Sequence, residues 1–299
     1  MTTMTNKYET PEIMMDVLRD KPYIRGGAAD YSATSLIQAP QQLQLKKRYK
    51  DQLKIDARDK WNIFLGNAVH HEIEKGLAFY PEKYMLERKF TDFIMGRKVV
   101  AVVDAYDNDK DIIYDHKTCK HFAYTDDHKK EWEQQLNINA YLMQEDGFQP
   151  EQAKILALTM DWMKGQTKWK GRDEYPINPM YLFDIPLWSQ ADREQFIRDR
   201  LALHIESEDL PDHELPECTD DEMWAKPATF AVKKKGVYVA KRVLSTRKEA
   251  EEWMSKSRLT DLYIEERPGS RVRCEDGWCD VASVCPQYRE YLEQKAELA

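Results

Sequence analysis

The sequence predicts an α/β protein with a central mixed sheet flanked by helices, followed by a small C-terminal α+β module bounded by cysteines. Three observations lead to this prediction. A helical pattern precedes three consecutive strand-like runs, at residues 84–93, 98–106 and 111–117. A helix, a strand and a long helix follow, and this alternation is typical of helices packed on a sheet. After residue 210 the composition changes, and lysine, arginine and cysteine become clustered.

The overall composition is that of a folded and highly charged chain. Hydrophobic residues make up 42% and charged residues 33% of the 299 residues, and the formal net charge is -8. These values exclude a disordered chain and argue weakly against a general nucleic-acid-binding protein. The chain contains no apolar run near the ~20 residues of a membrane helix and no signal-peptide pattern. We therefore expect a cytoplasmic protein without a membrane partner.

Three segments are expected along the chain. Residues 1–31 are predicted to form a loosely ordered arm with a short helix around 11–19. Residues 32–210 would form the core, and residues 211–299 a basic module. An acidic linker, 205–222, separates them with nine acids and no lysine or arginine. Residues 226–273 hold thirteen lysine and arginine residues against six acids, which suits phosphate binding and almost equally a solvated surface.

Local signals place the other elements. Ser32 is expected to cap a short helix, and Pro40 to break it and begin a second one. Residues 64–80 carry an apolar stripe at spacing four, which predicts an amphipathic helix with His70 on a different face. The stripe consists of Leu65, Val69, Ile73 and Leu77. The later elements are a helix at 128–147 ended by Gly147, a strand at 153–163, a helix at 190–209, strands at 229–233 and 237–244, a helix at 246–256 and a strand at 262–267.

The hairpin formed by the second and third strands carries an unusual set of charges. One apolar run ends on Asp104 and the next on Asp115, with the turn 107–111 between them. Strand alternation puts Lys117 on the same side as Asp115, and Asp104 reaches that point across the ladder. Converging carboxylates repel each other unless a shared proton or a divalent cation neutralises them, and oxygen ligands suit Mg²⁺ or Mn²⁺.

A lysine beside such a cation can orient an attacking water and stabilise charge on a phosphoryl oxygen, which is the chemistry of phosphodiester hydrolysis. The hairpin alone leaves a second interpretation open, in which two strand-end acids flank a solvated lysine. His70 on the preceding helix and Gln135 on the following one favour the catalytic interpretation. An imidazole beside carboxylates suits Mn²⁺, and an amide can contact water or phosphate.

The ordered series Gly66-x3-His70, Asp104, Asp115-His116-Lys117-Thr118 and Gln135-Leu136 resembles the RecB-type branch of the PD-(D/E)XK nuclease superfamily. That branch includes the iron–sulfur exonucleases of CRISPR adaptation and AddB-type helicase-nucleases, and phage genomes carry stand-alone versions. The resemblance covers roughly residues 32–160 in motif order. It implies a restriction-endonuclease-like core in which His70, Asp104, Asp115 and the carbonyl of His116 bind the metal. Lys117 would activate water, and Gln135 would position substrate.

The sequence departs from that family pattern at three places. Ala101 stands where the family has a glycine, which is a mild change. Asn139 stands where a tyrosine is usual, so that Tyr141, two positions further on, becomes the candidate DNA contact. Ala39-Pro40 stands where many members have Cys-Pro, which removes the expected first ligand of an iron–sulfur cluster.

The cysteines near the C-terminus predict a metal centre. Cys274, Cys279 and Cys285 have the spacing C-x4-C-x5-C, and disulfides are not expected in a cytoplasmic protein. Cys218 is the candidate fourth ligand. The resemblance favours a 4Fe–4S cluster, whereas zinc fits four thiolates equally well on ligand type. Unligated cysteines in a small core are the alternative.

The combined prediction is a metal-dependent DNA nuclease in the cytoplasm of a bacterial host cell. Within phage recombination, replication or DNA processing, an exonuclease on DNA ends or single strands is favoured. A structure-selective endonuclease, or a non-catalytic DNA-binding or assembly protein, remains open. Expected partners are DNA and possible helicases, recombinases or single-strand-binding proteins. Lys233, Lys234 and Lys235 are expected to contact the phosphate backbone.

Overall fold

The structure is a computed structural model, and it describes residues 3–18, 29–124, 130–171 and 174–297. The chain divides into two compact units: the first is Met1–Gln38 with Lys54–Glu208, and the second is Ala39–Leu53 with Asp209–Ala299. The expected boundary at 210/211 lies two residues from this division. Residues 39–53, which the sequence assigned to the core, belong to the second unit. Part of the expected N-terminal arm, residues 1–2 and 19–28, lies outside the described residues.

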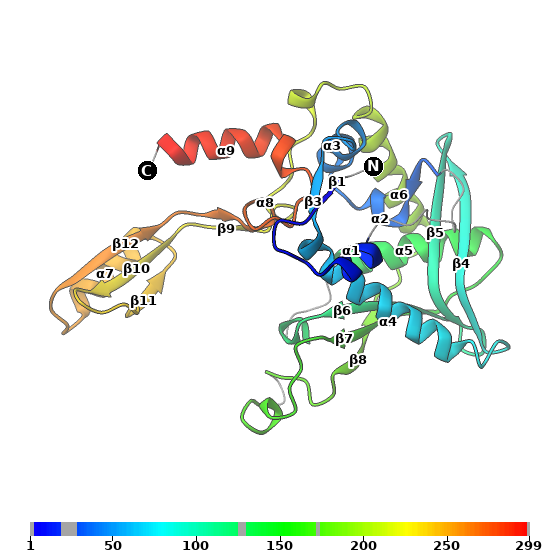
Figure 1. Cartoon of the computed structure of the whole chain (residues 1–299), viewed down its shortest axis with the longest axis horizontal. Coiled ribbons are helices and arrows are strands. Elements are labelled where there is room, and N and C mark those ends of the chain that lie inside the picture. Colours follow the sequence, from blue (N-terminus) through cyan, green and yellow to red (C-terminus); the bar gives the residue numbers. More distant parts are fainter. Residues whose placement is uncertain (1–2, 19–28, 125–129, 172–173, 298–299) are drawn as a thin grey trace. The chain divides into compact units, whose positions relative to one another are not determined.

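The first unit contains a six-stranded mixed sheet (Figure 1). Its order is β2-β5-β6-β7-β8, and β4 pairs with β5. β5 and β6 are antiparallel, β6 and β7 parallel, and β7 and β8 antiparallel. The bounds are β2 (Tyr31–Ser32), β4 (Tyr84–Ile94), β5 (Arg97–Asp107), β6 (Ile112–Cys119), β7 (Gln152–Thr159) and β8 (Met180–Ile185). The mixed sheet and its central hairpin are confirmed, whereas β8 was not predicted.

Helices flank this sheet. Ser32 caps α2 (Ala33–Leu36) with a capping box, in which its side chain accepts from the Ser35 N–H. α4 (Trp61–Leu77) contacts β4, β5 and β6, and its predicted apolar stripe is half-buried. α5 (Lys130–Glu145) packs on β4, β5, β6 and β8 and against α6 (Gln190–Glu206). Gly147 follows α5 with φ 91°, the left-handed conformation that favours glycine beyond a helix.

The N-terminal part of the first unit adds small elements. β1 (Thr3–Thr5) pairs in parallel with β3 (Lys54–Asp56), and α1 (Glu12–Leu18) lies where a short helix was predicted.

No helix in the described residues is long and apolar enough to span a membrane. Short 3-10 turns occur at η1 (Ala57–Lys60), η2 (His121–Tyr124), η3 (Gln166–Lys168), η4 (Asp212–Glu214) and η5 (Ala282–Val284).

The second unit combines helix α3 (Pro40–Arg48) with the C-terminal part of the chain. Leu45 and Leu53 are buried against Leu215, Val281 and Cys285, which explains why residues 39–53 belong here. The remaining elements are β9 (Ala225–Lys226), β10 (Thr229–Lys234), β11 (Arg242–Leu244), α7 (Arg247–Lys256), β12 (Leu262–Arg267), β13 (Ser270–Arg271), α8 (Val272–Glu275) and α9 (Pro286–Glu297).

A three-stranded antiparallel sheet in the order β11-β10-β12 carries α7 on it. Ala231, Val232 and Ala250 form its buried centre. The predicted strand at 237–244 is wrong over its first half. Only Arg242–Leu244 pair with β10, and residues 235–241 form a loop in which the Lys241 N–H donates to the Val232 carbonyl.

Candidate active site and cysteine centre

The two acids of the hairpin lie where the sheet opens. One edge of β5 pairs with β4, and its other edge is shared by β2 at Val99–Val100 and β6 at Ala105–Asp107. The β5–β6 ladder ends at the pair Ala105 and Tyr114. Asp104 and Asp115 are therefore the first residues beyond the paired segment. Burial, and then the nearby Asp115 carboxylate, raise the pKa of Asp104.

The β4 side of Asp104 is interrupted as well. Leu86 pairs with Ala105 and Arg88 with Val103, so Glu87 and Asp104 are skipped in the register. Glu87 has φ 49°, a left-handed conformation that is costly for a residue with a Cβ. Both ladders of β5 thus break at Asp104, which frees this carboxylate from the regular pleat.

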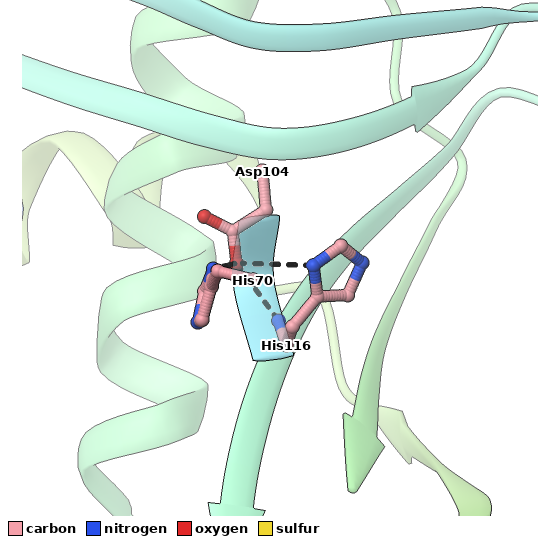
Figure 2. Close-up of side chains that lie close together, drawn as sticks. All are labelled: His70, Asp104 and His116. Atoms are coloured by element: carbon pink, nitrogen blue, oxygen red, sulfur yellow. Dashed lines mark hydrogen bonds and ion pairs between the residues drawn. The ribbon is translucent and has the colours of Figure 1, made fainter. Parts of the chain in front are cut away.

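Three side chains gather at this opening (Figure 2). His70 comes from α4, Asp104 from β5 and His116 from β6. Their ligand atoms lie within 4.8 Å of one another, and no other such group of three occurs in the parts of the chain that the structure describes. Oδ2 of Asp104 accepts from the His116 backbone N–H at 2.8 Å, and it lies 3.5 Å from Nδ1 of His70 and 3.9 Å from Nδ1 of His116.

A second set adjoins the first on β6 and α5. The Lys117 ammonium lies 2.7 Å from Oδ2 of Asp115 as an ion pair, although this contact lacks hydrogen-bond geometry. Lys117 also donates to Oε1 of Gln135 at 3.2 Å, and Nε2 of Gln135 donates to Oδ1 of Asp115 at 3.0 Å. Lysine, aspartate and glutamine thus form a closed ring of polar contacts.

The electrostatics of the site favour a bound cation. Burial and then the carboxylate of Asp115 raise the pKa of Asp104 to about 7. Burial lowers the pKa of His116 to about 4, so its imidazole is neutral at physiological pH. Nδ1 of His116 is buried and has no hydrogen-bond partner. A neutral imidazole with an unused ring nitrogen beside a destabilised carboxylate suits a divalent metal ion, and the residues present therefore fit one.

The imidazole of His116 is a further candidate ligand, and the role expected of its carbonyl stays a prediction. The resemblance implied its carbonyl as a ligand, whereas here the imidazole belongs to the group of three and its ring stacks edge-on against His70 at 5.4 Å. Asp115, whose role as a ligand stays a prediction, lies outside that group and contacts Lys117 and Gln135 in this structure. The sequence shows that His116 lies between the catalytic candidates Asp115 and Lys117, but it does not show which way the imidazole ring points.

The predicted DNA contacts fall in different environments. Tyr141 is buried, with 6% of its surface exposed, and burial raises its pKa to about 12. Its ring is therefore not available to a nucleic acid in this structure. Lys233 forms an ion pair with Glu265 at 2.7 Å, Lys234 is half-buried, and Lys235 is exposed.

In the second unit, four cysteines share one neighbourhood. Cys218 and Cys274 pack with Ala39, and Cys279 with Cys285. Oε1 of Gln41 lies 3.8 Å from the sulfur of Cys218 and 3.3 Å from that of Cys285, and both thiols donate to it. The pKa of Cys218 is raised by burial, then by Glu222 and the other three thiols.

None of the five cysteines forms a disulfide. Among the described residues, no three of the clustered sulfurs lie within 4.8 Å of one another. A tetrahedral zinc site with Zn–S bonds of ~2.3 Å would hold its sulfurs about 3.8 Å apart. On ligand type, four thiolates could hold either such a zinc ion or a larger iron–sulfur cluster.

The comparisons with known proteins give little further information. No family model matches the chain, and no curated protein does so either. The crystal structure of the protein SSO0001 is similar over 64% of this chain and 82% of that chain, with 17% identity and a TM-score of 0.42. A phage-related exonuclease from Haemophilus somnus 129PT is similar over 54% of this chain and 68% of that chain, with 11% identity and a TM-score of 0.27.

Proposed function

We propose that this protein is a divalent-metal-dependent nuclease that hydrolyses phosphodiester bonds in DNA. The observation that carries the proposal is the arrangement of Asp104, Asp115 and Lys117 at the point where β5 and β6 separate. Placing the largely buried Asp104 carboxylate beside the buried Asp115 carboxylate costs stability. A phosphodiester and its metal ion would use all three groups.

Each residue has a distinct part in this proposal. His70, Asp104 and His116 would hold Mg²⁺ or Mn²⁺, and Asp115 would join them once Lys117 turns toward substrate. When bound, the ion would polarise a phosphoryl oxygen and lower the pKa of a nearby water. Lys117 would orient the attacking water and stabilise charge that develops on the phosphate. Gln135 would keep the Lys117 and Asp115 side chains in position, because its amide oxygen accepts from Lys117 and its amide nitrogen donates to Asp115.

Exonuclease action on ends or single strands is favoured over sequence-specific cleavage, because no helix in the sequence has the character of a base-reading element. The rivals are a structure-selective endonuclease and a DNA-binding protein without turnover. Linear single strands labelled at each end in turn, and a circular single strand, separate the three in Mg²⁺ or Mn²⁺. We expect the linear strands to be shortened and the circle to stay intact. Cleaved circles would indicate an endonuclease, and no cleavage of either would contradict the proposal.

We also propose that Cys218, Cys274, Cys279 and Cys285 bind one metal centre, with a 4Fe–4S cluster favoured over zinc. The contacts of Gln41 with the sulfurs of Cys218 and Cys285, and the effect of the other three thiols on the pKa of Cys218, support a single centre, and the resemblance favours the cluster over zinc. Ala39, where the resembling nucleases have a cysteine, packs beside Cys218. The Cys218 side chain is therefore near the position that the side chain of a cysteine at residue 39 would occupy.

A further inference from the structure

The loop between β10 and β11, residues 235–241, has an unusual surface. Four consecutive residues, 237–240, are apolar, and Tyr238 is 97% exposed while Val239 is 75% exposed. Loops at the tips of hairpins are normally polar, and a run of exposed apolar residues is a liability unless it binds something. Gly236 has φ 76°, a conformation that turns the chain sharply at the start of the run.

Cations surround this apolar run. Lys234 and Lys235 precede it, and Lys241 and Arg242 follow it. None of these four side chains makes an ion pair or hydrogen bond with another described residue. No aspartate or glutamate occurs from residue 223 to residue 248. The apolar run is therefore flanked in sequence by positive charges that have no acidic partner among the described residues of the module.

Several other cations of the same module are neutralised by acids. Lys233 pairs with Glu265 at 2.7 Å, Arg267 with Glu265 at 3.0 Å, and Arg247 with Glu251 at 3.3 Å. If the basic residues served only solubility, paired and unpaired cations would be mixed over the surface. Lys226, Lys248, Lys256 and Arg258 also lack an ion pair among the described residues, but only the loop combines four such cations with a fully exposed aromatic ring at Tyr238.

We propose that this loop binds single-stranded nucleic acid, with Tyr238 stacking on an unpaired base while Lys235 and Lys241 contact the flanking phosphates. Every base offers a flat face to an aromatic ring, so the contact needs no particular sequence. In a duplex those base faces are covered by stacking, so a double strand would not contact the tyrosine ring in this way. An anionic protein could bind the lysines without a fully exposed aromatic ring. The inference rests on the proposed function for its substrate class, but it concerns binding rather than cleavage.

The loop is held by a small but ordered platform. The Lys235 N–H donates to the Asp261 carbonyl at 3.0 Å, and β10 pairs with both neighbouring strands. Tyr238 contributes almost nothing to the core because its ring is exposed. Its substitution should therefore leave the fold intact, so that a loss of affinity can be assigned to the missing ring.

The test is a fluorescence-anisotropy titration of the full-length protein in EDTA, which prevents cleavage. The probes are a labelled single strand of mixed sequence, the same strand with abasic sites throughout, and the corresponding duplex. Tyr238→Ala should weaken binding of the base-containing strand about five-fold or more and leave the abasic strand and the duplex unchanged. Tyr238→Phe should restore the affinity. Lys235→Glu with Lys241→Glu should weaken binding of all three probes.

Phe93→Ala provides the matched control, since Phe93 is also a highly exposed aromatic residue of a hairpin but lies beside Asp92. It should not change any affinity. Unchanged binding by Tyr238→Ala would overturn the inference, and so would an equal loss on the abasic strand or on the duplex. Because cleavage is blocked, the result does not depend on nuclease activity. A chain without that activity could still pass this test, and an active nuclease could fail it.

Discussion

The Lys117 ammonium and the Asp115 carboxylate, two positions apart on β6, lie 2.7 Å from each other. They share one face of the strand because side chains alternate along it. In this position Lys117 neutralises the carboxylate of Asp115, a residue that is only 3% exposed. The same lysine would have to leave this contact, or share it, when a cation and a phosphate arrive.

Lys117→Ala should remove nearly all nuclease turnover and leave the fold and DNA binding largely intact. The lysine side chain is about a quarter exposed but pairs with the buried Asp115 carboxylate, so its loss should lower the free energy of unfolding by roughly 1–3 kcal/mol, and a thermal melt should show that the variant is still folded. Its loss from the transition state should be far larger. Lys154→Ala, which removes the lysine of an ion pair with Asp184 on the neighbouring strands, is the control and should remain active. Turnover by Lys117→Ala within a few-fold of wild type would show that Lys117 is not catalytic.

Asp104→Asn and Asp115→Asn should each weaken binding of divalent metal and abolish cleavage. The amide preserves the shape of the side chain but removes the negative charge that attracts the ion. His70→Ala should have a milder effect, because carboxylates dominate the binding of hard cations. Calorimetric titration with Mn²⁺ measures this directly, with Asp184→Asn as the control. Equal affinity for Mn²⁺ in wild type and both asparagine variants would rule out the assigned site.

His116→Ala should shift the metal preference of the enzyme. If the imidazole is a ligand, its removal should weaken Mn²⁺ binding more than Mg²⁺ binding, because nitrogen ligands favour the softer ion. The ratio of the two affinities separates this effect from the loss of packing expected for a buried ring. An unchanged ratio would instead favour the backbone carbonyl of His116 as the ligand.

The fold could be predicted further from the sequence than the site. The alternating runs and the turn at 107–111 define the hairpin locally, and its register brings Asp104 and Asp115 together. β8 was missed because the run Met180–Ile185 directly follows a segment with two prolines, Pro176 and Pro179, and its role depends on pairing with β7. The imidazole of His116 and the place of residues 39–53 depend on packing between distant segments, which no local pattern encodes.

The cysteine centre can be tested by moving one ligand. Cys218→Ala should lose the bound metal, whereas Cys218→Ala combined with Ala39→Cys should recover it, because the two positions pack together. Cys119→Ser, in the first unit, should have no effect. Anaerobic purification followed by metal analysis and visible absorption gives the readout, in which a brown protein indicates iron–sulfur and a colourless one with stoichiometric zinc a zinc site. Absence of metal in the wild type, with all five thiols freely titratable, would refute the centre.

The most direct test of the nuclease proposal is the release of nucleotides from an end-labelled linear single strand by the wild-type protein. The reaction is followed in Mg²⁺, in Mn²⁺ and in EDTA, with Asp104→Asn measured alongside. We predict progressive shortening of the strand in either metal, none in EDTA, and none with the variant. Cleavage that persists in EDTA, or that Asp104→Asn retains, would contradict a metal-dependent site at Asp104; no cleavage by the wild type in either metal would contradict the nuclease itself.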